Sequence, residues 1–285
     1  MRNFILGTDW WTDCDDAVAI KLLANAVLAR KVGLLGIGIN ACMADSAASL
    51  TNFLKDCGLP DVPIGIDREA ADFGGNPPYQ KRLAAISGGV PGNDSVPDAV
   101  QLYLRLLRES KEPVEIIEIG YPQVLARVLE SAPELFREKV AKLWVMAGKW
   151  DENPGRENNF ARNLRSARAG HFLCEHAPVP VTFLGFEAGV SVITGGRLSP
   201  DSLLHQVLAD HGSPEGRSSW DPMLVQMAVL GDEERAGYRL VRGTASVDAE
   251  TGENTFRRSE TGLHGYVRKR FPDEYYRDRI DRELS

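Results

Sequence analysis

The chain has 285 residues, of which 43% are hydrophobic and 26% charged, and its formal net charge is −7. This length and composition predict a globular protein that forms one α/β domain over residues 1–285. Proteins that bind nucleic acid or a membrane surface present a basic face, so this acidic chain is expected to bind neither.

The four cysteines, Cys14, Cys42, Cys57 and Cys174, form no CxxC pair and no zinc-like cluster with histidine. We therefore expect reduced thiols in a cytoplasmic protein. The first apolar run meets an acid at Asp9, too early for a signal peptide or a membrane span, and we expect no span later in the sequence.

Short apolar runs alternate along the chain with longer amphipathic stretches. This alternation predicts an open, mainly parallel sheet with helices on both faces, around a Rossmann-like core. The expected strands are residues 4–8, 34–40, 63–66, 114–119, 142–146, 179–184 and 243–247. The expected helices are residues 16–29, 44–57, 95–109, 122–131, 164–176, 189–194, 202–209 and 222–230.

Two stretches are rich in glycine and proline, residues 74–78 and 88–93. Together they predict a long irregular insertion between sheet elements, and loops of this length are often functional lids. The charged stretch 268–283 predicts a solvated helix or tail at the end of the chain.

Four carboxylates, those of Asp9, Asp13, Asp15 and Asp16, lie within eight residues at the first strand-to-helix turn. Such charges repel one another, and a bound cation is the simplest feature that makes them tolerable. Carboxylate oxygen ligands of this kind suit Ca²⁺ or Mg²⁺. An alternative is that Asp13, Asp15 or Asp16 caps the following helix, but capping needs one acid and leaves three unexplained.

Three later places carry weaker signals. Asp221 precedes Pro222 at the start of a helical pattern, where it also suits a helix cap. Glu157 and Asn159 lie in a loop that follows an apolar run, where their side chains suit either a polyol or solvent. Asn40 ends an expected strand, where asparagine is common in turns.

Seven segments taken in order resemble motifs of the nucleoside hydrolase family, of the inosine/uridine-preferring type. Residues 8–20 (TDWWTDCDDAVAI) resemble its Asp-rich opening signature, DTDxGxDxDDAxAL. Residues 119–126 (IGYPQVLA) resemble TGPLTNLA, and residues 143–148 (LWVMAG) resemble the strand that ends in MGG. Residues 157–160 (ENNF), 163–167 (NLRSA) and 220–222 (WDP) resemble ExNF, DPEAA and the late HDP or WDP motif. Residues 185–197 match the GFExG…TGGRL pattern of a hydrolase-like subgroup.

The resemblance implies the nucleoside hydrolase fold and Ca²⁺-dependent hydrolysis of the N-glycosidic bond of a ribonucleoside or related N-ribosyl compound. The calcium ligands would be the carboxylates of Asp9, Asp16 and Asp221 and the carbonyl of Ile119. Asp9 would act as general base, and Asp15 would fix a ribose hydroxyl as the second catalytic residue.

Further substrate contacts are implied in the same way. Glu157 and Asn159 would hold the far side of the sugar, and Asn40 would add a further ribose contact. Met146 and Trp220 would also contact the substrate. The resemblance further implies a small-molecule nucleoside as partner and a homodimer or homotetramer.

Departures from the family pattern leave the substrate open. Some members have a histidine before the late aspartate, assigned to protonating the leaving base, and Trp220 stands there in this chain. Trp11 replaces a glycine of the opening signature, and beside Trp10 it forms either an aromatic wall or a narrowed pocket. A catalytically impaired nucleoside- or ribosyl-binding relative that keeps the metal site is therefore an alternative.

A phosphatase of the haloacid dehalogenase type is a second alternative, because residues 13–15 have the form DxD. That family places its first acid directly at the strand end. Here Asp9 has that position, and Trp11 stands where its partner acid would be.

Overall fold

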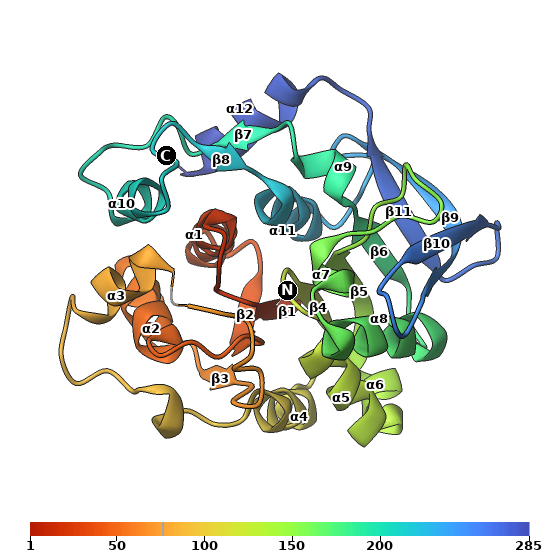
Figure 1. Cartoon of the computed structure of the whole chain (residues 1–285), viewed down its shortest axis with the longest axis horizontal. Helices are drawn as coiled ribbons and strands as arrows, with labels where there is room; N and C mark the ends of the chain where they lie inside the picture. The colour runs from red at the N-terminus through yellow and green to blue at the C-terminus, as the bar shows by residue number, and fades with distance from the viewer. Residues whose placement is uncertain (76, 285) are drawn as a thin grey trace.

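A nine-stranded sheet runs through the centre of the protein in the computed structural model, which describes residues 1–75 and 77–284 (Figure 1). Asn76, part of the 74–78 stretch discussed above, lies outside these residues. The strands in chain order are β1 (Asn3–Thr8), β2 (Gly33–Ile39), β3 (Ile64–Ile66), β4 (Val114–Glu118), β5 (Val140–Met146), β6 (Val181–Leu184), β9 (Tyr238–Val247), β10 (Asn254–Arg258) and β11 (His264–Lys269). Two short strands, β7 (Ile193–Thr194) and β8 (Arg217–Ser218), pair separately.

Helices connect most of the strands. They are α1 (Asp15–Leu28), α2 (Ser46–Asp56), α3 (Pro78–Ala84), α4 (Ala99–Glu109), α5 (Gln123–Ser131), α6 (Pro133–Lys139), α7 (Asn158–Ala161), α8 (Leu164–His176), α9 (Phe186–Gly189), α10 (Leu203–Asp210), α11 (Trp220–Leu230) and α12 (Asp273–Leu284). A short 3₁₀ turn, η1, covers Asn93–Ser95.

The strand order is β10-β9-β11-β6-β5-β4-β1-β2-β3. Strands β1 to β6 and β11 pair in parallel, and β9 and β10 add an antiparallel edge. The predicted open and mainly parallel sheet is confirmed. The chain leaves β1 toward β2 on one side and reaches β4 on the other, so the order reverses at β1. In open α/β sheets, ligands bind outside the carboxyl ends of the strands at such a reversal.

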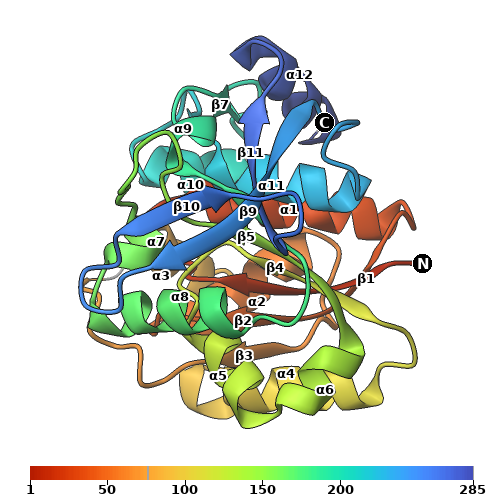
Figure 2. The ribbon, with the colours of Figure 1, turned by 90° about the vertical axis from the view of Figure 1, so that its right-hand side faces the viewer.

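Two apolar cores cover the two faces of the sheet. Successive side chains of a strand point to opposite faces, and Phe4 and Leu6 accordingly join one core while Ile5 joins the other. In Figure 2, α1 and α11 lie above the sheet, and α4, α5 and α6 lie below it. The glycines of β2 let α4 approach closely, since a Cβ added at Gly38 would lie 2.6 Å from the ring of Tyr103.

Three sequence expectations need correction. Residues 189–194 are not a helix, because α9 ends at Gly189 and the β-branched pair Ile193–Thr194 forms β7. The 74–93 region contains α3, which packs against α2, so it is not simply irregular. The 268–283 stretch contains the expected helix but is not wholly solvated. Its first residues finish β11, and the rest forms most of α12, which buries Tyr276, Ile280 and Leu284.

Within residues 1–75 and 77–284, no helix is long and apolar enough to cross a membrane.

Candidate active site

A cavity of about 240 Å³ opens at the carboxyl ends of β1, β4 and β5, beside the strand-order reversal. Every site residue expected from the sequence except Asn40 lines it. The wall consists of Asp9, Trp11, Thr12, Asp13, Asp15, Asp16, Ile119, Tyr121, Met146, Glu157, Asn158, Asn159, Arg162, Phe186, Trp220 and Asp221. The fold therefore joins segments up to two hundred residues apart at one place.

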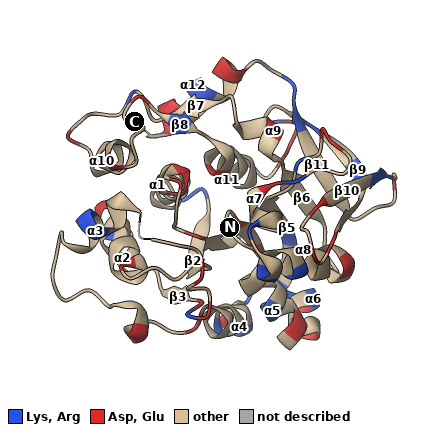
Figure 3. Ribbon diagram, viewed as in Figure 1, with Lys and Arg blue, Asp and Glu red and all other residues tan. Residues whose placement is uncertain are grey.

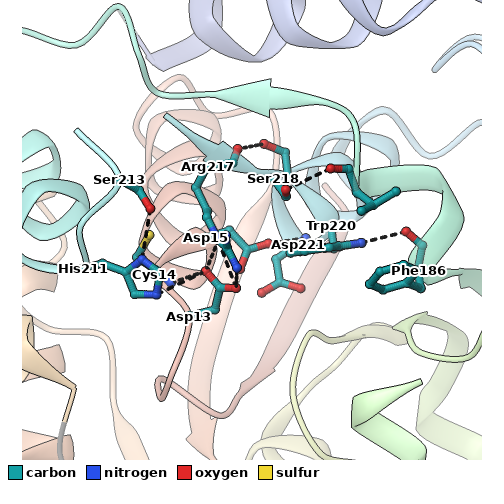
Figure 4. A network of polar contacts seen from close by, with 12 residues as sticks. Asp13, Cys14, Asp15, Phe186, His211, Ser213, Arg217, Ser218, Trp220 and Asp221 are labelled. Carbon is teal, nitrogen blue, oxygen red and sulfur yellow. Dashed lines mark hydrogen bonds and ion pairs between the residues drawn. The ribbon is translucent and has the colours of Figure 1, made fainter. Parts of the chain in front are cut away.

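Three carboxylates form the tightest part of the wall. One carboxylate oxygen from each of Asp15, Asp16 and Asp221 lies within 4.8 Å of the others. Asp15 and Asp16 belong to the first turn of α1 and Asp221 to the first turn of α11, where helix N-termini favour negative charge. The amide of Asp221 donates to Asp15 Oδ2 over 3.1 Å and so ties the two helix ends together (Figure 4).

Burial sets the protonation of this cluster. The pKa values of Asp9, Asp15, Asp16 and Asp221 are all raised, first because burial disfavours the ionised form and then because neighbouring carboxylates repel it. Hydrogen bonds to the ionised form oppose the shift. Asp9 Oδ1 accepts from the amide of Trp11 over 3.1 Å, and Asp16 Oδ1 accepts from the hydroxyl of Thr8.

The donor set fits a hard divalent cation. Among the described residues, none of these four carboxylates makes an ion pair with lysine, arginine or histidine, although all four are buried. The acidic first turn of α1 is red in Figure 3. Carboxylates with a carbonyl nearby, here that of Ile119, are ligands that Ca²⁺ and Mg²⁺ accept. A cation would offset the repulsion that raises these pKa values.

Asp13 differs from its neighbours because it is paired. Arg217 donates to both of its oxygens, the closest contact being 2.7 Å, and His211 Nε2 lies 3.9 Å from Oδ1 (Figure 4). The expected helix cap is absent, because α1 begins after Cys14 without a side-chain cap. The alternative of a cap at Asp221 is also wrong, since α11 already begins at Trp220 after Ser219.

The loop after β1 has an unusual backbone. Trp10 and Thr12 have positive φ angles of 49° and 62°, a region that non-glycine residues rarely adopt. Trp10 is held there by the bond from its indole nitrogen to Ser49 Oγ (2.8 Å) and by Gln80, which donates to its carbonyl. Trp11, which replaces the family glycine, has an ordinary φ. Strain of this kind persists where the surrounding structure enforces it, often at functional sites.

The sugar-binding residues implied by the resemblance lie across the cavity at the start of α7. Glu157 accepts from the amides of Asn159 (2.8 Å) and Gly148 (2.9 Å), and burial raises its pKa to about 7 against these bonds. Asn159 Nδ2 donates to the carbonyl of Met146 over 2.8 Å, which ties α7 to the end of β5.

Aromatic rings form two further parts of the wall. Trp220 stacks on Phe186, with centroids 5.6 Å apart, and its indole nitrogen donates to the Phe186 carbonyl. Trp11 and Tyr121 both pack on Phe73 in a small apolar cluster. Trp10 is not part of a wall, because it is fully buried against Phe53 and Tyr79 in the core.

Asn40 does not reach the cavity, so the expected sugar contact is not supported. It is fully buried, and its Nδ2 donates to Glu118 Oε1 over 2.7 Å. Its Oδ1 accepts from the amide of Tyr121 over 2.9 Å. Glu118 Oε1 also accepts from the amide of Gly120. Asn40 and Glu118 thus fix the turn that carries Ile119.

The sequence did not single out Thr12, Tyr121, Asn158, Arg162 or Phe186, which also line the cavity. Thr12, Tyr121, Asn158 and Phe186 lie inside segments that carried a signal, and Arg162 lies between two such segments. Arg162 follows the ENNF segment and Tyr121 follows Ile119, so proximity to these segments was the available signal.

No family model and no curated protein matches the sequence, but solved structures match the fold. The inosine–uridine preferring nucleoside hydrolase from Bacillus anthracis is 15% identical, with a TM-score of 0.73 over 100% of this chain and 99% of that chain. A plant nucleoside hydrolase is 15% identical, with a TM-score of 0.75 over 99% and 98%. The type III effector protein XopQ, solved in complex with adenosine diphosphate ribose, is 15% identical, with a TM-score of 0.68 over 99% and 93%. This chain therefore has the nucleoside hydrolase fold.

Proposed function

We propose that this protein hydrolyses the N-glycosidic bond of a ribonucleoside or a related N-ribosyl compound, giving the free base and the sugar, with the help of Ca²⁺. The observation that carries the proposal is the group of four buried carboxylates without basic partners at the strand-order reversal. The proposal is supported by the fold, which is shared with a hydrolase that prefers inosine and uridine.

The cation ligands would be Asp9, Asp16, Asp221 and the carbonyl of Ile119, and Asp15 lies close enough to join them. When bound, Ca²⁺ would supply positive charge that acidifies a water molecule and orients the ribose hydroxyls. The four carboxylates would bind as ionised groups, so binding would release the protons that burial favours.

The protein's own side chains would perform the remaining steps. Asp9 would accept the proton of the attacking water, and Asp15 would accept a hydrogen bond from a ribose hydroxyl. Glu157 and Asn159 would hold the sugar from the α7 side. Because the transition state places positive charge on the sugar ring, the surrounding carboxylates stabilise it more than they stabilise the substrate.

The leaving base would lie between the aromatic parts of the wall. The exposed faces of Trp220 and Phe186 offer a stacking surface, and Trp11 offers another. The indole nitrogen of Trp220 already donates to a carbonyl, so this residue would bind the base through its face only.

The test is an assay of purified protein with inosine, uridine, adenosine and guanosine, with calcium and after chelation by EGTA. Release of free base that stops on chelation and returns with calcium would support the proposal. Absence of ribose release from all four nucleosides in calcium would refute it.

The second candidate is a protein that binds a nucleoside or ribosyl compound without cleaving it. It is favoured by the cavity wall, which contains no histidine among residues 1–75 and 77–284 to protonate a leaving base. XopQ, which shares the fold, was solved with adenosine diphosphate ribose. Calorimetry that shows calcium-dependent binding of a nucleoside, without product by chromatography, would favour this candidate.

A further inference from the structure

Arg162 is the one basic residue in the cavity wall among the described residues, and it has no acidic partner there. Its Nη2 donates to the carbonyl of Phe73 over 2.8 Å, and its guanidinium lies 4.9 Å from the ring centroid of Trp11. Two other arginines from the same side, Arg165 and Arg168, pair instead with Asp72 and Glu250. The charge of Arg162 is therefore left available to a ligand.

Arg162 lies beside Asn159, one of the residues proposed to hold the sugar. It follows α7 with helical dihedral angles of φ −62° and ψ −45°, three residues after Asn159. Residues three apart on a helical turn lie on the same side, and both side chains line the cavity. Arg162 and Asn159 thus belong to the same side of the cavity wall.

The chemistry of ribose indicates which substituent would reach this place. The 2′- and 3′-hydroxyls lie on one edge of the ring, and C5′ extends from the other side. If the diol faces Asp15, Asp16 and Asp221, C5′ points toward Asn159 and a group attached to it extends toward Arg162. This step rests on the function proposed above.

We propose that the site takes N-ribosyl compounds that carry a 5′-phosphate and that Arg162 binds this phosphate. A guanidinium presents N–H groups in a planar fork that matches two phosphate oxygens. In the reaction, a water oxygen bonds to C1′ and the C1′–N bond breaks, its electron pair passing to the base. The base takes up a proton, so the products are the free base and ribose 5-phosphate.

The experiment compares each of the four nucleosides with its 5′-monophosphate in calcium, as the ratio of their kcat/KM values. We expect the wild-type protein to favour the monophosphate. Arg162→Gln should lower the ratio roughly tenfold, because a charge-assisted hydrogen bond is lost. Arg162→Lys keeps the positive charge but loses the planar guanidinium, so it should retain part of the preference for the monophosphate.

Arg165→Gln is the matched control. Arg165 also holds the loop before α3, since it donates to the carbonyl of Glu69 and to Asp72, but it does not line the cavity. For Arg165→Gln, the ratio of the kcat/KM values for monophosphate and nucleoside should equal that of the wild type. A wild-type ratio of one or less, or equal losses in Arg162→Gln and Arg165→Gln, would overturn the inference.

A second measurement separates failure of the proposed hydrolysis from failure of the phosphate site. If neither nucleosides nor nucleotides are cleaved, calorimetry with ribose 5-phosphate and ribose still tests the role of Arg162. Binding of ribose 5-phosphate about tenfold tighter than ribose, lost in Arg162→Gln, would support the phosphate site without turnover. Equal affinities for the two sugars would exclude it.

Discussion

Asp9 combines three properties that suit a general base. It follows β1 directly, it is buried, and the amide of Trp11 fixes the direction of its carboxylate. Its charge is opposed by Asp15, Asp13 and Glu118, all of which raise its pKa. A group in this environment accepts a proton more readily than an exposed aspartate does.

Replacement of Asp9 by asparagine should separate catalysis from stability. Asparagine cannot accept the proton of the water, so turnover should fall by about 10²-fold or more. The protein should remain folded, because asparagine keeps an oxygen that accepts from the amide of Trp11. In EGTA the thermal midpoint should not fall, because one of several repelling charges has been removed. Initial rates and thermal unfolding measure both effects, and unchanged turnover would remove Asp9 from the base role.

For Asn40 we predict a loss of stability rather than a loss of turnover. Asn40→Ala removes one of the two donors to buried Glu118 and leaves the amide of Tyr121 without its acceptor, so the free energy of unfolding should fall by about 2–3 kcal/mol. Urea denaturation measures this loss. Asn158→Ala, which removes one partly buried hydrogen bond to the hydroxyl of Tyr121, is the matched control and should cost about 1 kcal/mol or less. A raised KM with unchanged stability would restore Asn40 as a sugar contact.

Residue type determined which site residues the sequence could identify. Clustered carboxylates such as Asp15 and Asp16 stand out because repulsion makes them costly without a purpose. Phe186 and Tyr121 did not stand out, since aromatic residues are as common in cores as in binding sites. The expected sugar contact of Asn40 was wrong, because an asparagine at a strand end can point either to the cavity or to a neighbouring turn. Here its hydrogen bond to buried Glu118 holds it toward the turn.

At the scale of elements, the first six strands were predictable, and most of the later part of the sheet was not. Strands β1, β4 and β5 each contain consecutive buried apolar residues, as expected where both faces are covered. Strand β10 (Asn254–Arg258) is largely exposed and polar, so its sequence carries no apolar signal. Its pairing with β9 supplies the backbone hydrogen bonds that its composition does not reveal.

Helix α12 was also hard to predict as a packed helix, because most of its sequence is charged. Its few apolar residues pack against α1, α11 and β7, and Asn25 of α1 donates to the carbonyl of Glu283 over 2.8 Å. Ile280→Ala should lower the free energy of unfolding by about 2–4 kcal/mol through lost burial and a cavity. Exposed Arg282→Ala, in the same helix, should change it by about 0.5 kcal/mol or less. Equal small effects in urea denaturation would mean that α12 is not docked.

At the scale of the whole molecule, folding buries carboxylates that water surrounds in the unfolded chain, and it brings Asp221 close to Asp15 and Asp16. In the folded protein, pKa values are raised for the four clustered aspartates, for Glu157 to about 7 and for Glu118 to about 8. Between about pH 4, where these groups titrate when unfolded, and about pH 8, the native state holds more protons than the unfolded state. Stability without metal must therefore fall as the pH rises through this range.

The thermal midpoint in EGTA should accordingly be lower at pH 8 than at pH 5. Millimolar calcium should reduce or reverse this fall, because it binds the ionised carboxylates of the folded state only. Asp221→Asn should flatten the profile in EGTA and weaken the calcium effect. A midpoint that rises with pH in EGTA, or one that calcium leaves unchanged at pH 8, would contradict this account.

The sequence by itself determined the α/β class, the order of the parallel strands along the chain and the acids that follow β1, because apolar periodicity and local charge density are properties of neighbouring residues. The tertiary structure alone decided that Asn40 turns away toward Glu118 and that Arg162 enters the wall without an acidic partner among the described residues. These outcomes depend on how strands pair and helices pack across long stretches of chain. Contacts between residues so far apart leave no periodic trace in the sequence.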